Sequence, residues 1–404
     1  MGIYGRIFCS LQDVSLSSVL RSGQSFRWVK MESGEWVGPL GRYLWILRQD
    51  ETGVDFRVLS AEGAGPGLQQ VKAQAIIEDY FQLSVSLPDL YRTWSAADPA
   101  FKSIGGKLPG VRMLRQDPVE NLFCFICSSN NNIQRITSMV EKLCERYGEP
   151  ICEYGGRAFH AFPTVSALAA ADVEPELRQL GFGYRARFIG QTAQQLAERG
   201  GEAWLLALRR AAYRDCHAEL RQLCGVGAKV ADCVCLMSLD QAAAVPVDTH
   251  VHQLAARHYL PHLRSVKSLT DRAYREVADH FRKVFGERAG WAQAVLFCGD
   301  LNEFKTLPDP PLTAKKTDVR PAKAGKSSNQ KSGTKKSARS ASESVTIVNE
   351  RAPLKRSRTC SSAKETSLDA IGENTGSSSK VSRAVSTAEH RSSRRSKRQQ
   401  VPST

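Results

Sequence analysis

Residues 223–229 read Leu-Cys-Gly-Val-Gly-Ala-Lys, and residues 245–248 read Val-Pro-Val-Asp. Residues 214–223 have a helix-forming composition, the glycines then interrupt it, and residues 228–239 resume with apolar side chains around most of the helix circumference. This pattern predicts two helices joined by a tight turn, of which the second is buried. The turn is not a nucleotide-binding P-loop, because the first glycine of that motif is missing and no Ser or Thr follows the lysine.

Lys229 and Asp248 are the candidate catalytic residues of these two segments. A lysine amine at the start of a buried helix can act as a nucleophile toward carbon. Asp248 precedes a further predicted helix, where a carboxylate accepts backbone N–H groups. Gly225 and Gly227 lack a Cβ, so the N–H groups of the turn can point at a phosphate. The combination predicts covalent chemistry on DNA, although each residue alone is equally typical of a solvated lysine or a helix cap.

Four further segments carry a family resemblance: Ser-Gly-Gln-Ser-Phe-Arg-Trp at 22–28, Ser-Ser-Asn-Asn-Asn-Ile at 128–133, Gly-Phe-Gly-Tyr-Arg-Ala-Arg at 181–187 and Gly-Trp-Ala-Gln-Ala-Val-Leu-Phe at 290–297. Together with the glycine turn they resemble the eukaryotic 8-oxoguanine DNA glycosylase/AP lyase of the helix-hairpin-helix DNA glycosylase superfamily. The resemblance covers residues 10–305 in the same order. Cys224 departs from it, because the family commonly has proline at this place.

The resemblance implies a reaction in which the target nucleotide is flipped out of the duplex and its base is removed. Lys229 matches the family's lysine, which attacks the anomeric carbon of the sugar, displaces the base and forms a Schiff base that permits strand cleavage by β-elimination. Asp248 matches the aspartate that stabilises the positive charge developing on the sugar. The family partner is double-stranded DNA with 8-oxoguanine opposite cytosine.

By the same resemblance, five residues form the 8-oxoguanine pocket. The lesion differs from guanine in carrying a hydrogen on N7, where guanine offers only a lone pair. A backbone carbonyl placed there favours the lesion by about 1–3 kcal/mol in a buried site. The resemblance implies that Gly23 supplies this carbonyl, and that the other four pocket residues contact a face or an edge of the base. The pocket residues are Gly23, Cys233, Gln293, Phe297 and Asp300.

Further matched residues lie on the DNA side of the predicted site. The opposite cytosine is held by Asn130, Arg135 and Arg185, whose donors suit an orphaned base edge. Tyr184 matches the wedge beside the vacated stack, and His250 matches a residue that contacts the phosphate backbone. Without the resemblance, the three asparagines from residue 130 read as a polar loop with helix caps.

The predicted fold class is α+β. Strand-like runs at 26–30, 36–40, 44–47 and 54–59 predict an antiparallel sheet, and the pattern from residue 69 onward is mainly helical. We expect an N-terminal antiparallel β domain at 1–105, a helical glycosylase domain at 106–310 with the helix-hairpin-helix at 214–239, and a disordered basic tail at 311–404.

Charge is unevenly distributed along the chain, whose formal net charge is +15. Residues 311–404 hold 21 Lys and Arg against 7 Asp and Glu, whereas residues 1–310 hold 35 basic and 34 acidic residues. The basicity therefore belongs to the tail, which has too few large apolar residues to fold alone. Its clusters at 355–358 and 394–398 predict nuclear import or nonspecific DNA binding, with a merely solubilising tail as the alternative.

The cysteine pattern predicts reduced thiols and no metal centre. The 11 cysteines are dispersed, and Cys124-x-x-Cys127 has no second pair at zinc spacing. No metal, cofactor or membrane span is predicted. We expect a monomer located in the nucleus, with other base-excision repair proteins as possible partners. Residues 1–21 do not resemble a mitochondrial transit segment.

Two other functions remain compatible with the residues alone. The chain could be a glycosylase for another damaged or mispaired base, or a non-catalytic helix-hairpin-helix DNA-binding protein. Lys229 argues against glycosylases that lack lyase activity, and base release would exclude a pure binding protein.

Overall fold

The computed structural model describes residues 2–60, 68–266 and 268–301. All of them belong to one compact unit, Met1–Thr317. The predicted disordered tail at 311–404 lies outside the described residues. The predicted domain boundary after residue 105 stays a prediction.

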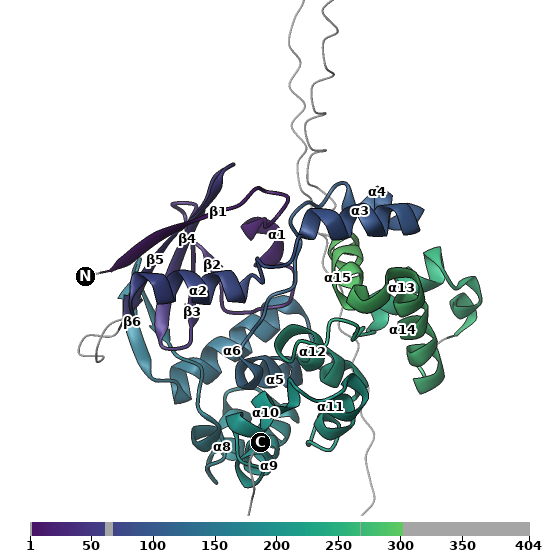
Figure 1. Cartoon of the computed structure of the whole chain (residues 1–404). Helices are drawn as coiled ribbons and strands as arrows, with labels where there is room; N and C mark the ends of the chain where they lie inside the picture. Colours follow the sequence, from purple (N-terminus) through teal and green to yellow (C-terminus); the bar gives the residue numbers. More distant parts are fainter. Residues whose placement is uncertain (1, 61–67, 267, 302–404) are drawn as a thin grey trace, which may run out of the picture. The chain divides into compact units, whose positions relative to one another are not determined.

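An antiparallel five-stranded sheet forms the N-terminal part, in the order β1-β5-β4-β3-β2 (Figure 1). The predicted sheet is therefore confirmed. The first strand was missed, and the strand predicted at 26–30 keeps only its last two residues. The Trp28 indole, just before it, donates to the Tyr80 hydroxyl at 2.9 Å. The strands are β1 (Ile3–Phe8), β2 (Val29–Lys30), β3 (Trp36–Leu40), β4 (Tyr43–Gln49) and β5 (Gly53–Ser60).

Both faces of the sheet are covered, which explains why β4 reads as a nearly continuous apolar run. Trp45 and Leu47 face one core that also contains residues of helix α2 (Gln70–Tyr80). Leu44 and Ile46, which alternate with them, pack on the opposite side against the hairpin of β6 (Pro150–Tyr154) and β7 (Arg157–His160).

The β6–β7 hairpin was missed by the prediction of a mainly helical pattern after residue 69. Its turn contains Gly155 and Gly156, whose φ angles are 56° and 75°. Two consecutive positive φ angles match the two-residue hairpin turn that suits the twist of antiparallel strands. A Gly-Gly pair between short apolar runs was therefore a usable signal.

Helices make up most of the remaining structure, and α5 and α12 pack against each other within it (Figure 1). α5 is buried on nearly every residue because it carries Val119, Leu122, Phe123, Phe125 and Ile126. The helices are α1 (Leu16–Val19), α3 (Leu87–Ala97), α4 (Pro99–Gly105), α5 (Pro118–Cys127), α6 (Ile133–Tyr147), α7 (Val165–Leu168), α8 (Val173–Gln179), α9 (Arg185–Glu198), α10 (Glu202–Leu208), α11 (Tyr213–Leu220), α12 (Ala228–Ser238), α13 (Thr249–His258), η1 (Pro261–Ser265), α14 (Asp271–Phe285), η2 (Gly286–Arg288) and α15 (Ala289–Asp300).

The predicted helix-hairpin-helix is present as α11, the turn at 221–227 and α12. Gly225 has a φ of 75°, and a Cβ on it would lie 2.5 Å from the Phe188 ring, so the turn requires glycine here. α9 holds the turn: the Cys224 N–H donates to Gln195 Oε1 at 2.8 Å, and the Thr192 hydroxyl donates to the Cys224 carbonyl at 2.6 Å. A proline at residue 224 could not make the first bond.

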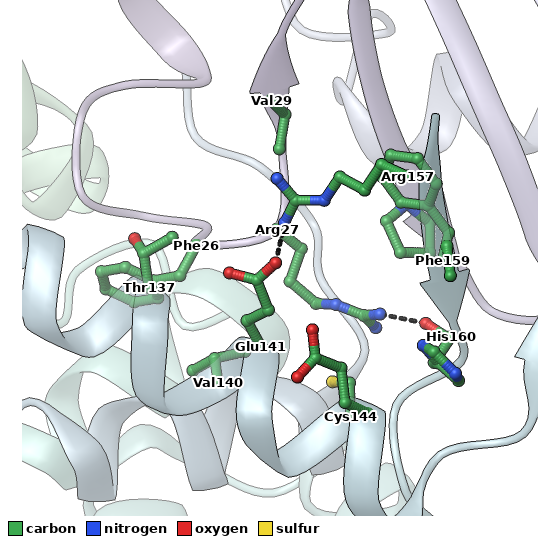
Figure 2. A pocket seen from close by; sticks show the side chains of 13 residues that line it. Phe26, Arg27, Val29, Thr137, Val140, Glu141, Cys144, Arg157, Phe159 and His160 are labelled. Carbon is green, nitrogen blue, oxygen red and sulfur yellow. Dashed lines mark hydrogen bonds and ion pairs between the residues drawn. The ribbon is translucent and has the colours of Figure 1, made fainter. Parts of the chain in front are cut away.

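A small pocket lies between the sheet and α6 (Figure 2). Arg27 donates there to the carbonyl of His160, and its guanidinium pairs with Glu120 at 3.1 Å. Arg157 and Glu141 form a second ion pair across the same pocket. The catalytic candidates do not line this pocket, and we interpret it as a structural joint.

Candidate active site

A second cavity brings most of the candidate residues together. It contains about 460 Å³ of space, counting its opening to solvent. Its walls come from the loop before β2, from α5, α12 and α15, and from the segment that leads into α13. The lining residues are Ser22, Gly23, Gln24, Phe125, Lys229, Cys233, Met237, Pro246, Asp248, Val251, Gln293, Ala294, Phe297 and Cys298.

Lys229 stands in the first turn of α12, as predicted. Its Nζ donates to the Ser128 hydroxyl at 3.1 Å and lies 4.8 Å from the centre of the Phe125 ring. Both contacts come from the C-terminal end of α5, so the packing of α5 on α12 fixes the direction of the amine. The amine is half-buried and opens into the cavity.

Asp248 is the N-cap of α13, which confirms the predicted cap. Its Oδ1 accepts the Val251 N–H at 2.9 Å. One carboxylate oxygen is thus tied to the helix, while the residue also lines the cavity. Asp248 and Lys229 thus line the same cavity, an arrangement that suits stabilisation of a cationic sugar by a carboxylate.

The predicted base-recognition residues share the same cavity, with one exception. Burial raises the pKa of the Cys233 thiol to about 12, whereas the neighbouring Lys229 lowers it, so Cys233 presents a neutral wall. Gln293 is 5% exposed, and within the described ranges its side-chain amide has no hydrogen-bond partner. Phe297 lies half-buried with its ring edge-on to His250 at 6.3 Å. Because its amide is unpaired among the described residues, Gln293 can offer both a donor and an acceptor to a bound base.

Asp300 does not line the cavity. It ends α15 and pairs with Arg257 of α13 at 2.6 Å. The resemblance placed it in the pocket, but this ion pair turns its carboxylate toward α13.

The loop that carries Gly23 is held by Gln24, which is 2% exposed. Gln24 Nε2 donates to Ser22 Oγ at 3.0 Å and to the Arg112 carbonyl at 3.1 Å, and its Oε1 accepts the Leu114 N–H at 3.0 Å. Gly23 itself has a φ of 77°. Gln116, also buried, donates its Nε2 to the Gln24 carbonyl at 2.9 Å. The Gly23 carbonyl therefore lies in a loop whose conformation is fixed by two buried amides.

The DNA-side candidates gather around the turn after α5. Tyr184 donates its hydroxyl to the Ser129 carbonyl at 3.0 Å, and Arg185 donates to the carbonyls of Ser129 and Asn130. Asn130 has a φ of 47° and is exposed. Arg135 is also exposed, in the first turn of α6.

Arg185 differs from what its predicted role suggests, because it is only 3% exposed. Its guanidinium lies 4.6 Å from the centre of the Tyr184 ring, and its buried Nε has no hydrogen-bond partner among the described residues. Both carbonyl contacts are made by Nη2. His250 and Gly227, by contrast, are exposed at the helix starts.

Several site residues were not predicted individually. Gln24 lies inside a quoted motif, so its place beside Gly23 was a signal. Phe125 and Ser128 had no comparable signal, because they meet Lys229 only through the packing of α5 on α12.

Neither a metal centre nor a membrane-spanning helix is found in the part of the chain that the structure describes. No group of three or more His, Cys, Asp and Glu side chains there is arranged to hold a metal ion. No helix within it combines the length and the apolar character needed to cross a membrane.

Two family models match consecutive parts of the chain. The N-terminal domain of 8-oxoguanine DNA glycosylase matches residues 6–122. The HhH-GPD superfamily of base excision DNA repair proteins matches residues 123–280. The matches thus cover the sheet, the glycine turn and Asp248.

Named relatives agree with these models. The N-glycosylase/DNA lyase OGG1 of Arabidopsis thaliana is 40% identical over 299 residues, which covers 73% of this chain and 80% of the relative. The N-glycosylase/DNA lyase of Saccharomyces cerevisiae is 36% identical, over 74% of this chain and 86% of the relative. The Clostridium acetobutylicum 8-oxoguanine glycosylase/lyase, solved with double-stranded DNA containing cytosine opposite 8-oxoG, is 28% identical with a TM-score of 0.61, over 71% of this chain and 91% of that one. The chain belongs to the 8-oxoguanine DNA glycosylase family of N-glycosylase/DNA lyases.

Proposed function

We propose that this protein removes 8-oxoguanine lying opposite cytosine in duplex DNA and then cleaves the damaged strand. The observation that carries the proposal is the single cavity shared by Lys229, Asp248, Gly23, Gln293 and Phe297. It places a nucleophile and a carboxylate beside groups able to read a purine edge and stack on its face. The described helix-hairpin-helix supplies a surface for the DNA backbone.

In the proposed reaction, a bond forms between Lys229 Nζ and the anomeric carbon while the glycosidic bond breaks. The base leaves with the bonding electrons and takes up a proton. The fixed charge of Asp248 stabilises the cationic sugar during this exchange. Loss of the amine proton and opening of the sugar ring give a Schiff base, which acidifies the neighbouring C2′–H and lets the 3′ phosphate leave by β-elimination.

Selection of the lesion is assigned to the Gly23 carbonyl, which accepts the extra N7–H of 8-oxoguanine. The Gln293 amide is assigned to the Watson–Crick edge of the base. Phe297 and Cys233 line the cavity and are assigned to the two faces of the base. Guanine would leave the carbonyl facing a lone pair, a penalty of about 1–3 kcal/mol. Asp300 is not given a direct contact in this scheme.

The opposite strand is assigned to the cluster at the turn after α5. Asn130, Arg135 and Arg185 hold the orphaned cytosine, and Tyr184 fills the vacated stack. Tyr184 is 46% exposed, so its ring is available to stack in the space that the flipped base leaves. Gly225, Gly227 and His250 are assigned to backbone phosphates, where contacts hold the strand without reading its sequence.

We assign the protein to the nucleus as a monomer that can act beside other base-excision repair proteins. The basic clusters at 355–358 and 394–398 support this assignment, since such clusters serve nuclear import or nonspecific DNA binding. Localisation of a tagged protein with and without both clusters tests it.

Borohydride trapping tests the proposed reaction. The full-length protein should form a covalent complex with an 8-oxoguanine:cytosine duplex, and Lys229→Gln should abolish it because an amide cannot form a Schiff base. Lys142→Gln, an exposed lysine on α6 outside the cavity, is the matched control and should trap normally. An adduct that persists in Lys229→Gln would remove Lys229 from the reaction.

A panel of duplexes distinguishes the proposal from its alternatives. Rapid release of an alkylated or mispaired base without release of 8-oxoguanine would assign the protein to another lesion. Tight duplex binding with no base release at all would identify a non-catalytic binding protein.

A further inference from the structure

A buried carboxylate beneath the cavity links the nucleophile's helix to the segment that carries Asp248. Asp232 lies on α12, three positions after Lys229, and is 1% exposed. It does not line the cavity. Its two oxygens accept the hydroxyl of Tyr213 and the hydroxyl of Tyr274, each at 2.5 Å. Such short bonds to a charged acceptor are among the strongest hydrogen bonds in proteins.

The two tyrosines come from different elements, α11 and α14, so Asp232 joins three helices. Burial raises the pKa of the Asp232 carboxyl, whereas His217 and then the two hydroxyls lower it. Burial and the nearby carboxylate raise the pKa of each tyrosine, so both hydroxyls keep their protons and donate. Removing one partner would leave this buried carboxylate short of a donor.

Only Tyr274 extends the link toward the catalytic carboxylate. Its hydroxyl also accepts the backbone N–H of Val247 at 3.3 Å. Val247 is fully buried, follows Pro246, which has no N–H, and directly precedes Asp248. This bond therefore ties the residue before Asp248 to α12 through two side chains. Within the described residues, the Tyr213 hydroxyl bonds Asp232 and makes no such second contact.

We propose that Asp232 and Tyr274 are positioning residues, which set the Asp248 carboxylate relative to the Lys229 amine by holding the Val247 backbone against α12. The inference rests on the catalytic roles proposed for Lys229 and Asp248. Neither positioning residue touches the substrate. Their effect falls on the rate of base release, because a carboxylate displaced by about 1 Å from a reacting centre can lose about 100-fold in rate.

The test compares Tyr274→Phe with Tyr213→Phe in the full-length protein. Each variant removes one hydroxyl from Asp232, but only Tyr274→Phe frees the Val247 N–H. Single-turnover release of 8-oxoguanine should slow by about 10-fold or more in Tyr274→Phe and by less than about 3-fold in Tyr213→Phe. The dissociation constant of the duplex should stay near the wild-type value in both, and thermal unfolding reports the shared loss of stability.

Equal rates of release in the two variants would overturn the inference, as would a loss in Tyr274→Phe that appears in duplex affinity instead of rate. Wild-type release and its loss in Lys229→Gln separately test the proposed function. If those hold and the tyrosine variants do not differ, only the positioning role fails.

A double-substitution cycle with Asp248→Glu adds an independent measure. The longer side chain already displaces the carboxylate by one methylene, so adding Tyr274→Phe should then slow release by less than it does in the wild type. Residues that act through one group show such non-additive losses. Losses that simply multiply would mean that Tyr274 does not act through Asp248.

Discussion

Substitution by alanine at the two glycines of the hairpin turn should affect different properties, the stability of the fold at Gly225 and duplex binding at Gly227. An alanine at residue 225 would have to keep a backbone φ of 75°. Its Cβ would lie 2.5–2.7 Å from atoms of the Phe188 side chain. The left-handed backbone costs an L residue about 1–2 kcal/mol, and forcing a methyl into a packed site costs about 1–3 kcal/mol. Gly225→Ala should therefore lower the free energy of unfolding by about 2–5 kcal/mol.

Gly227 is the matched control within the same turn. Its φ is −88°, and no atom lies within 4 Å of a Cβ placed there. Gly227→Ala should change the free energy of unfolding by less than about 1 kcal/mol. If the DNA backbone approaches the exposed turn closely, its methyl would hold a phosphate away from the N–H groups. The duplex dissociation constant should then rise by about 10-fold, the equivalent of one hydrogen bond to a charged group.

Urea unfolding followed by circular dichroism, and fluorescence anisotropy with an undamaged duplex, measure the two effects. Equal unfolding midpoints for the two variants would show that the Phe188 contact and the positive φ do not require glycine at residue 225. Unchanged duplex affinity in Gly227→Ala would show that the strand does not approach this turn.

Two further predictions concern buried groups. Asn121→Leu should raise the free energy of unfolding by about 1–3 kcal/mol in urea, because both polar atoms of this fully buried amide lack a partner in the described part of the chain; a decrease would mean that an ordered water satisfies them. Because burial raises the pKa of the Cys233 thiol to about 12, iodoacetamide at pH 8 should label half-exposed Cys224 well before Cys233, as read by mass spectrometry. Prompt labelling of Cys233 in the folded protein would contradict its protonated, buried state.

Local signals allowed the catalytic elements to be predicted from sequence. A glycine turn, an apolar helix and a carboxylate before the next helix are each encoded within a few residues, and the structure contains all of them at 223–229 and 245–248. The strand β1 was missed because its run, Ile3–Phe8, alternates weakly and pairs with β5 far along the chain. Pairing of that kind depends on tertiary structure more than on local propensity.

The cavity itself could not be assembled from local patterns. Gly23 and Gln293 come from the two ends of the folded part, and only the family resemblance connected them before the structure was known. The resemblance also assigns Asp300 to the pocket, a role that stays a prediction, while in this chain its carboxylate pairs with Arg257 of α13. A motif match transfers the residue, but the neighbours in this chain decide where the side chain points.

The proposed discrimination between 8-oxoguanine and guanine depends on a backbone atom, and this determines which substitutions can alter it. No side-chain change removes the Gly23 carbonyl, and the φ of 77° resists substitution of the glycine itself. The orientation of the carbonyl depends instead on Gln24, whose amide bonds Ser22 on one side and Leu114 on the other. Specificity should therefore be more sensitive to this buried amide, which touches no base, than to the cavity wall at Cys233. In the proposed reaction, such a site separates cleavage, which is assigned to the Lys229 amine, from selection, which is assigned to a loop that holds its shape.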